Sequence, residues 1–492
     1  MRRGAVILLL MVVAGAPVLA QKAFPSITAD DRIIVVAPHP DDEVLGAGGL
    51  IQQACAIGAE VHVIYLTSGD HNQIAFKLYK LRLHLSPSQY IAFGEIRNRE
   101  AAAAMALLGL TRDQLTFLGY PDYGTMQIWR DHWGDTPAFR SDATHTNAVP
   151  YPDAFGYGQS YRPENVVANF VELFRRIRPT KVFVTHPADT NPDHRAAANF
   201  VRLAALEVAA EQKPPQLYYY VVHFGRWPFP YHYHPENELE PPQQLLDDGD
   251  WLTLPLTPEQ AQKKYEAILQ NHTQLTTRQY FLVAFARADE IFATIDVLPV
   301  PEVPADAVIN WKKAIRAKAL GLSPGEAPDK TGPEHVLLEE LAAMDLEETA
   351  YVRQGDDLIA QVTLHNRLGK RANVHLLLYG YKRGSDFATL PKVHINITPF
   401  GNVHVFDDLR RVKVEDVRVI SIENHLVVRV PLRLLGDEVP DLIFTATRAN
   451  LGEVAADDTA WHLFSLSNDS VNGHTSKQPS KQPTSRPPLW VK

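Results

Sequence analysis

Residues 35–43 read VVAPHPDDE, an apolar run followed by one imidazole and three carboxylates. Carboxylates this close together repel one another unless a proton or a cation lies among them. Imidazole and carboxylate ligands with an open coordination position are typical of hydrolytic zinc sites. The spacing of His39 and Asp42 would let both side chains turn to one point on a tight loop. Asp41 would then lie beside the metal ion, where it could take a proton from the attacking water.

A second cluster, THPADTNPDHR, occupies residues 185–195 and again joins an apolar run to a helical pattern. If the two clusters meet, His194 completes a His/Asp/His set with His39 and Asp42 and leaves a position open for water. Asp193 is placed to orient a neighbouring polar group.

Helix capping is the simpler explanation for Asp41 and Asp42, because acids are favoured at a helix N-terminus. Capping accounts for one aspartate but not for His39, so the metal site is the preferred interpretation. His186 could be a further site residue, but we favour a histidine that only finishes its strand. The glycines of GAGG at 46–49 hint at a dinucleotide loop, yet the third glycine that this motif requires is missing.

The elements that must position both clusters alternate between strand and helix from about residue 31 to 286. Apolar runs predict strands at 33–37, 61–67, 115–120, 181–186 and 216–222. Helical patterns cover 44–57, 94–110, 162–177, 195–210 and a stretch that Thr257 caps. This order predicts an α/β fold, a mostly parallel sheet with helices on both faces. Both clusters then lie at the carboxyl edge of the sheet, where open α/β sheets bind ligands.

Two long stretches, 121–161 and 223–256, interrupt this pattern and are rich in glycine, proline and aromatic residues. Loops of this length inside a domain are usually functional. Their aromatic rings could floor a ligand groove or simply pack the loops onto the domain, and both interpretations stay open. The rings in question are Trp129, Trp133, Tyr157, Trp227, Tyr231 and Tyr233.

The rest of the chain indicates several further segments. The first 21 residues have two arginines, an apolar run and small residues before Gln21, which favours a cleaved signal peptide over a membrane anchor. After residue 335, apolar runs at regular spacing predict an all-β, sandwich-like domain. The expected organisation is a signal peptide at 1–21, a catalytic domain at 22–296, a Pro-rich linker at 297–335, a β-sandwich-like domain at 336–466 and a disordered tail at 467–492.

Composition limits the partners of the protein. The net charge of the 492-residue chain is −9 and no long basic stripe occurs, which argues against nucleic acid. The single cysteine, Cys55, excludes an intrachain disulfide. We expect an exported bacterial protein, periplasmic or secreted, with a glycan or small-molecule substrate and no membrane span after signal cleavage. The oligomeric state stays open.

The motifs APHPDDE (37–43) and PDHRAA (192–197) resemble those of the PIG-L/LmbE-like deacetylases, which are zinc-dependent N-acetylglucosaminyl deacetylases. GEIRNREAAAAMALLGL and LGYPDYG resemble two further segments of that family, so the likeness extends over about residues 30–290. The resemblance implies a Rossmann-like fold and one zinc ion. The roles that it implies are zinc ligation by His39, Asp42 and His194, general base catalysis by Asp41, and contact of Arg97 and Asp122 with sugar hydroxyls.

The chain departs from the family pattern at Asn191, where better-known members have histidine. An amide can donate a hydrogen bond to an oxyanion, but it cannot carry a proton. Either Asp41 serves as both base and acid, or a histidine takes the acid role; the candidates are His186, His223, His232 and His234.

The combined interpretation is a zinc-dependent hydrolase that removes acetyl from an N-acetylated sugar or glycoconjugate. Hydrolysis of another amide or an ester would use the same groups. A non-catalytic carbohydrate binder is the third hypothesis, because the C-terminal β region faintly resembles accessory modules of carbohydrate-active enzymes.

Overall fold

The computed structural model describes residues 22–71, 85–321, 345–366, 372–399, 401–413, 416–451 and 454–467. The signal peptide and, but for its first residue, the disordered tail lie outside these residues, so both stay predictions. The chain divides into two compact units, Met1–Ile295 and Asp296–Lys492. Within the described residues, no helix has the length and apolar character to cross a bilayer.

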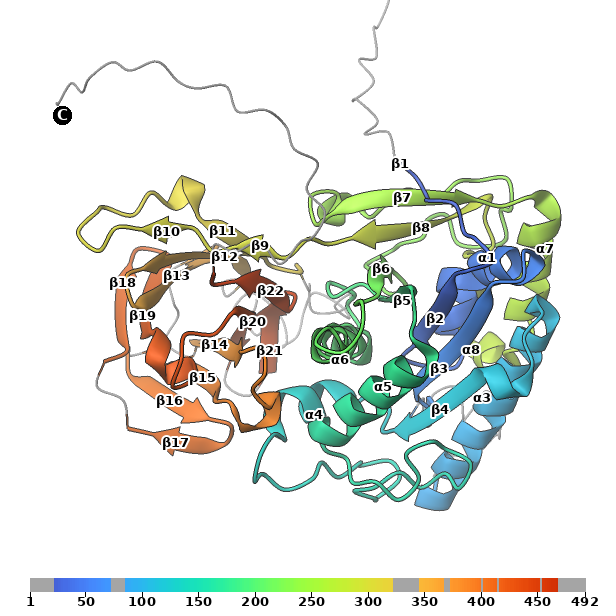
Figure 1. Ribbon diagram of the computed structural model, residues 1–492, viewed down its shortest axis with the longest axis horizontal. Helices are drawn as coiled ribbons and strands as arrows, with labels where there is room; N and C mark the ends of the chain where they lie inside the picture. Colours follow the sequence, from blue (N-terminus) through green and yellow to red (C-terminus); the bar gives the residue numbers. More distant parts are fainter. Residues whose placement is uncertain are drawn as a thin grey trace, which may run out of the picture. The chain divides into compact units, whose positions relative to one another are not determined.

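One eight-stranded sheet forms the centre of the first unit (Figure 1). Its strands are β1 (Lys22–Ala23), β2 (Arg32–Ala37), β3 (Glu60–Thr67), β4 (Leu115–Tyr120), β5 (Lys181–Thr185), β6 (Gln216–Tyr220), β7 (Asp250–Pro255) and β8 (Asp289–Thr294). They lie in the order β1-β7-β8-β6-β5-β2-β3-β4. The five strands from β6 to β4 pair in parallel, as predicted, whereas β8 runs antiparallel to both β6 and β7.

Helices cover both faces of this sheet. The α-helices are α1 (Asp42–Ala56), α3 (Pro87–Leu108), α4 (Thr125–Asp131), α5 (Pro163–Ile177), α6 (Pro192–Val208), α7 (Pro258–Ile268) and α8 (His272–Val283), and two 3-10 turns lie at η1 (Arg112–Gln114) and η2 (Gln243–Leu245). Helices α1, α3 and α7 contact one another, and α4 and α5 contact α6 as a second group (Figure 1). In β2, Ile33 and Val35 face the core beside α1 and α3, while Ile34 and Val36 alternate to the other face and are equally buried. A strand covered on both faces is therefore a continuous apolar run.

The chain connections diverge between the neighbouring central strands β2 and β5. After β2 the chain moves to β3 on one side, and after β5 it moves to β6 on the other side. The connections thus diverge between these two strands. A crevice at such a point is where open α/β sheets bind ligands.

The glycines at 46–49 serve packing in α1. A Cβ atom on Gly46 would lie 2.1 Å from Cδ2 of Tyr220, and one on Gly49 would lie 2.3 Å from Cδ2 of Leu256. No side chain fits at either distance, so glycine lets α1 approach its neighbours closely. Close packing of α1 therefore explains the GAGG run, and a dinucleotide-binding loop is not needed to account for it.

The second unit consists of two largely antiparallel sheets. The first has the order β10-β12-β13-β19-β18, with β11 beside β12, and the second has the order β17-β16-β15-β14-β20-β22-β9, with β21 beside β20. Buried residues of both sheets belong to one apolar core. The strands are β9 (Leu298–Pro299), β10 (Glu302–Val303), β11 (Ile315–Lys318), β12 (Leu346–Gln354), β13 (Asp357–Leu364), β14 (Ala372–Tyr381), β15 (Lys392–Ile397), β16 (Val403–Asp407), β17 (Arg410–Val412), β18 (Arg418–Ile422), β19 (His425–Pro431), β20 (Leu442–Leu451), β21 (Val454–Asp458) and β22 (His462–Ser465), and the 3-10 turns are η3 (Trp311–Lys313), η4 (Phe387–Thr389) and η5 (Leu432–Leu435).

The Pro-rich segment predicted as a linker, 297–335, is integrated into this unit over its described part. Strand β9 pairs with β22, and β10 and β11 pair with β12. Val300 and Ala317 are buried. The linker prediction was wrong here because proline, which lacks an N–H donor, is compatible with short strands at a sheet edge. Residues 322–335 lie outside the described residues.

Candidate active site

The two acidic clusters meet at the carboxyl ends of β2 and β5. His39 and Asp42 follow β2 directly, and His194 lies in the first turn of α6. The side chain of Asn191 caps this helix by accepting a backbone hydrogen bond of 2.9 Å. The carbonyl of His194 accepts a hydrogen bond of 2.8 Å from Oγ1 of Thr185, at the end of β5. These two hydrogen bonds hold the start of α6 so that the imidazole of His194 lies beside His39, just after β2.

The three side chains predicted to bind a metal form a tight triangle. Nδ1 of His39 lies 3.1 Å from Oδ2 of Asp42 and 3.1 Å from Nε2 of His194, and that Nε2 lies 3.1 Å from the same carboxylate oxygen. Ligand atoms around a tetrahedral zinc ion lie about 3.3 Å apart, given bonds of about 2.0 Å. Two imidazole nitrogens face each other here, which requires a proton or a cation between them. The donor set and its spacing therefore fit a divalent metal ion.

Carboxylates behind both imidazoles fix which nitrogen faces the triangle. Nδ1 of His194 lies 3.1 Å from Oδ2 of Asp189. Nε2 of His39 lies 3.2 Å from Oδ1 of Asp122 and 3.3 Å from Oδ2 of Asp193. The carboxylates behind the rings favour a proton on Nδ1 of His194 and on Nε2 of His39. The other nitrogen of each ring would then offer its lone pair to a cation shared with Asp42. This arrangement is typical of metal-binding histidines.

The local field also favours positive charge. Burial alone would lower the pKa of His194, but the carboxylates of Asp189 and Asp42 outweigh it and raise the pKa to about 9. Burial likewise opposes the shift at His39, whose pKa is raised well above its usual value, chiefly by Asp122. Burial would raise the pKa of Asp42, but the two imidazoles hold it well below its usual value. Asp42 is therefore ionised, as a metal-binding carboxylate must be.

Asp41 occupies the position expected of a base. It precedes α1 with a backbone φ of 134°, a conformation that non-glycine residues rarely adopt. Its amide donates a hydrogen bond of 3.0 Å to Oε2 of Glu43, and Nη2 of Arg97 lies 3.2 Å from its Oδ2. Burial raises the pKa of Asp41 to about 6, although Arg97 acts to lower it. The carboxyl group can therefore gain and lose a proton near neutral pH.

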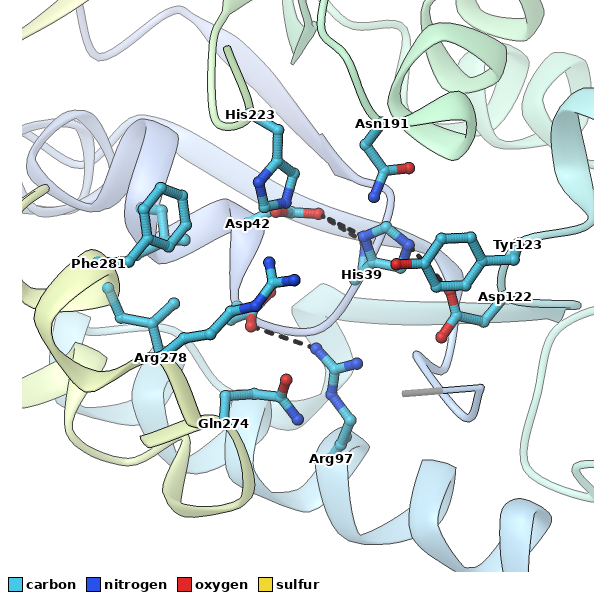
Figure 2. A pocket seen from close by; sticks show the side chains of 13 residues that line it. His39, Asp42, Arg97, Asp122, Tyr123, Asn191, His223, Gln274, Arg278 and Phe281 are labelled. Atoms are coloured by element: carbon cyan, nitrogen blue, oxygen red, sulfur yellow. Dashed lines mark hydrogen bonds and ion pairs between the residues drawn. The ribbon is translucent and has the colours of Figure 1, made fainter. Parts of the chain in front are cut away.

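A cleft of about 490 Å³, open to solvent, lies over these groups. Figure 2 shows the ring of side chains around it, with the α8 residues opposite Asp122 and Tyr123. The lining residues are His39, Asp41, Asp42, Leu45, Arg97, Asp122, Tyr123, Asn191, His223, Gln274, Arg278, Phe281 and Leu282.

Of the remaining predicted site residues, Asp122, Asn191 and Arg97 line the cleft, whereas Asp193 does not. Asp122 and Asn191 line the cleft, and the amide nitrogen of Asn191 points toward His39 (Figure 2). Arg97 also lines it, but its guanidinium group donates to the carbonyl groups of Gly69 and Pro40, each at 2.8 Å, besides Asp41. The guanidinium group of Arg97 therefore holds the loop that carries Asp41, whereas the prediction gave it a contact with sugar hydroxyls.

Asp193 is buried below the cleft and does not line it. Its Oδ1 accepts from the amide of Thr125 at 3.0 Å, and its Oδ2 accepts from the amide of Tyr123 at 2.6 Å and faces Nε2 of His39. These contacts join the loop after β4 to His39. They match the orienting part that the sequence suggested for Asp193.

Among the four histidines considered for the acid role, only His223 lines the cleft. Its ring centroid lies 5.0 Å from that of His194, and it stacks on Phe281 at 5.4 Å. Burial, together with His194, lowers the pKa of His223 to about 4, so the ring is neutral near neutral pH. His186 is fully buried, accepts a hydrogen bond of 3.1 Å from the amide of Ala188 and stacks on Trp251.

The aromatic residues singled out in the two long loops do not line the cleft. Trp129 and Trp133 are buried, and Trp129 packs edge-on against Phe200 of α6. Trp227 and Tyr233 pack against the core of the first unit. The packing interpretation is the one that these four rings support. The aromatic side chains that do line the cleft are Tyr123 and Phe281.

Sequence reasoning missed Asp189 and the cleft residues of α8. Asp189 stands inside the quoted second cluster, but spacing alone does not separate an orienting carboxylate from a ligand. Helix α8 reads HTQLTTRQYFLV, which has no clear apolar period, so neither the helix nor Gln274, Arg278 and Phe281 could be singled out.

Part of the chain that holds this site is similar to known proteins. Residues 34–205 match the sequence model of the PIG-L family, described as GlcNAc-PI de-N-acetylase. A 1D-myo-inositol 2-acetamido-2-deoxy-alpha-D-glucopyranoside deacetylase of Nocardioides sp. is 31% identical over 182 residues, which are 36% of this chain and 55% of the relative. The protein of the same name from Rhodococcus opacus is 30% identical over 190 residues, which are 38% of this chain and 57% of the relative.

This chain thus spans just over half the length of these curated relatives. Among solved structures, N,N'-diacetylchitobiose deacetylase from Pyrococcus horikoshii covers 54% of this chain, with 84% of its own length aligned, 18% identity and a TM-score of 0.34. The matched residues 34–205 contain both motifs and all three corners of the triangle. Over these residues, the chain matches the PIG-L family model.

Proposed function

We propose that the protein is a zinc-dependent N-deacetylase that hydrolyses the acetamide group of an N-acetylated sugar or glycoconjugate. The observation that carries this proposal is the His39–Asp42–His194 triangle beside Asp41, at the floor of one open cleft. The family match and the names of the curated relatives support the same reaction class.

The triangle would hold zinc, which supplies Lewis acidity for the acetamide carbonyl and lowers the pKa of a water molecule. Asp41 accepts the proton of this water as its oxygen adds to the carbonyl carbon. Arg97 keeps the carboxylate of Asp41 aimed into the cleft, and the amide nitrogen of Asn191 is directed to donate to the developing oxyanion.

The C–N bond then breaks, and the leaving nitrogen needs a proton. Asp41 holds the proton taken from water and can return it, which balances the reaction to acetate and amine. His223 is the second candidate donor because it alone among the four candidate histidines lines the cleft. Since His223 is neutral near neutral pH, Asp41 is the stronger candidate.

The backbone of Asp41 favours catalysis over mere binding. A non-glycine residue with a φ of 134° costs stability, and such outliers are kept where function needs the side chain in one place. A binding protein that uses only the triangle has no need of this conformation.

Acetate release from a panel of N-acetylated sugars, measured with and without a chelator, tests the proposal. We expect release that stops with the chelator, returns with added zinc and is absent in Asp41→Asn. Asp30→Asn, which changes an exposed carboxylate that does not line the cleft, is the matched control and should keep full activity. Chelator-resistant release would contradict the metal. Turnover of simple esters without release from any acetamide would instead show a hydrolase of another bond.

A further inference from the structure

We propose that Arg278 selects substrates that carry an anionic group, carboxylate or phosphate, beside the N-acylated sugar. This inference deepens the proposed function and rests on it. Arg278 lines the same cleft as His39, Asp42 and Asp41. It lies outside residues 34–205, so the family match says nothing about it.

Helix α8 is held in place from its first turn. The amide of Thr273 donates to Oε1 of Glu100 at 3.0 Å, and its hydroxyl donates to Oε2 of the same carboxylate at 2.6 Å. Both residues are buried, which fixes α8 on α3. The backbone of α8 then leaves helical geometry at Arg278, where φ is −132° and ψ is 24°. The side chain extends from this kink into the cleft (Figure 2).

Each acidic side chain that lines the cleft is paired with a group other than Arg278. Arg97, the other lining arginine, is paired with Asp41. Asp42 belongs to the triangle, and Asp122 faces His39. Within the described part of the chain, the guanidinium group of Arg278 has no hydrogen bond or ion pair. A cation with no partner on the wall of a binding cleft is available to a ligand.

The surroundings of Arg278 make such an interaction selective. Phe281 lines the cleft one turn further along α8 and stacks on His223, which forms an apolar flank. Burial is the main cause that lowers the pKa of His223, so this flank is neutral as well as apolar near neutral pH. An ion pair beside apolar groups is stronger than one in open water.

The chemistry of the guanidinium group identifies the ligand class. Its planar fork of N–H donors matches carboxylate and phosphate oxygens in pairs, which a lysine ammonium group cannot do. A neutral sugar hydroxyl would leave most of these donors in water. The favoured substrate is therefore an N-acylated sugar with an acidic substituent.

Two matched pairs of substrates test this inference with the zinc-loaded full chain. One pair is N-acetylmuramic acid and its neutral primary amide, and the other is N-acetylglucosamine 6-phosphate and N-acetylglucosamine. We expect kcat/KM for the acidic member of at least one pair to exceed that for the neutral member by about 10- to 100-fold. The pair that shows the preference tells carboxylate from phosphate.

Variants then assign the preference to Arg278. Arg278→Gln should bring the ratio within a pair close to one, and Arg278→Lys should retain part of it. Arg176→Gln removes an exposed arginine of α5 that does not line the cleft, and it should keep both ratio and activity. No preference in either pair, or a preference that survives Arg278→Gln, would overturn the inference.

A binding measurement separates this inference from the proposed function. If no acetate is released from any of the four compounds, calorimetric titration with the same pairs replaces the kinetic readout. Tighter binding of an acidic member that is lost in Arg278→Gln would then support Arg278 while the deacetylase proposal fails. Equal or absent binding of acidic and neutral members would overturn the role of Arg278.

Discussion

Oδ2 of Asp189 lies 3.1 Å from Nδ1 of His194, whose Nε2 faces His39. The same carboxylate accepts backbone hydrogen bonds from Val222 and His223, at 3.0 and 2.9 Å. Asp189 therefore fixes the orientation of His194 and ties it to the chain after β6. Asp189 does not line the cleft, so we expect it to position the predicted ligand His194 and not to contact the substrate.

Replacing Asp189 should weaken metal binding more than it weakens the fold. We expect Asp189→Asn to reduce zinc affinity by about 10- to 100-fold, because the histidine loses the carboxylate that fixes its tautomer. Competition with a chromogenic chelator measures this affinity. Excess zinc should restore part of the activity, which a general loss of structure would not allow. Unchanged affinity would contradict the positioning role.

Asp41→Asn should separate metal binding from turnover. The amide keeps the shape of the side chain but cannot accept the proton of water, so we expect kcat to fall by about 100- to 10,000-fold. Bound zinc, measured by elemental analysis, should stay at one ion per chain. Normal activity in this variant would remove Asp41 from the role of base.

Activity should decline as the pH falls and Asp41 takes up a proton, with a midpoint below about 6 because bound zinc also favours the carboxylate. Burial raises the pKa of Asp41 to about 6, and a protonated carboxyl group cannot accept a proton. Arg97 acts to lower this pKa, so Arg97→Gln should shift the acidic limb of the profile to higher pH. The readout is kcat/KM against pH at saturating zinc, with the metal content determined at each pH so that loss of zinc is not mistaken for protonation of the base. A limb that stays in place would argue against the Arg97–Asp41 pair.

The glycines of α1 supply a prediction about stability. A Cβ atom on Gly46 would overlap the ring of Tyr220, whose hydroxyl donates to the carbonyl of Val36 at 2.8 Å. Gly46→Ala should therefore destabilise the first unit by about 1–3 kcal/mol. Gly48→Ala is the milder comparison, because its Cβ would lie 3.2 Å from Cγ of Lys264 and 3.3 Å from Cγ2 of Val44. Thermal unfolding of both variants measures the difference, and equal midpoints would contradict the packing explanation.

The sequence predicted the central strands because burial on both faces leaves them as continuous apolar runs. The five predicted runs correspond to β2 to β6, within two residues at either end. The search for continuous apolar runs did not identify strands β7 and β8. Strand β7 reads DWLTLP and β8 reads DEIFAT, and both carry polar residues at alternate or terminal positions. They pair with each other antiparallel at one side of the sheet, where the parallel pattern no longer applies.

Within the site, residues next to strand ends could be predicted and residues on distant elements could not. His39, Asp42 and His194 follow strands that parallel pairing brings to one edge. Arg278 and Phe281 lie on a helix that no periodicity indicates, and Asp189 orients a ligand through a contact that only coordinates reveal. The short strands β9 to β11 of the predicted linker show the same limit. Their pairing depends on partners more than 30 residues away in the chain, such as Tyr351 opposite Ile315.

The ligand triangle itself provides the most direct prediction. Replacing His39, Asp42 or His194 with alanine should each lower bound zinc well below one ion per chain, because two remaining ligands do not form a closed site. His62→Ala, which changes a histidine paired with Glu60 outside the cleft, should keep its zinc. Elemental analysis after dialysis against a weak chelator gives the comparison, and circular dichroism shows whether each variant is folded. Full zinc retention by a folded variant of any of the three would exclude that residue as a ligand. If all three retained it, the metal would be bound elsewhere and Asp41 would lose its place beside the ion.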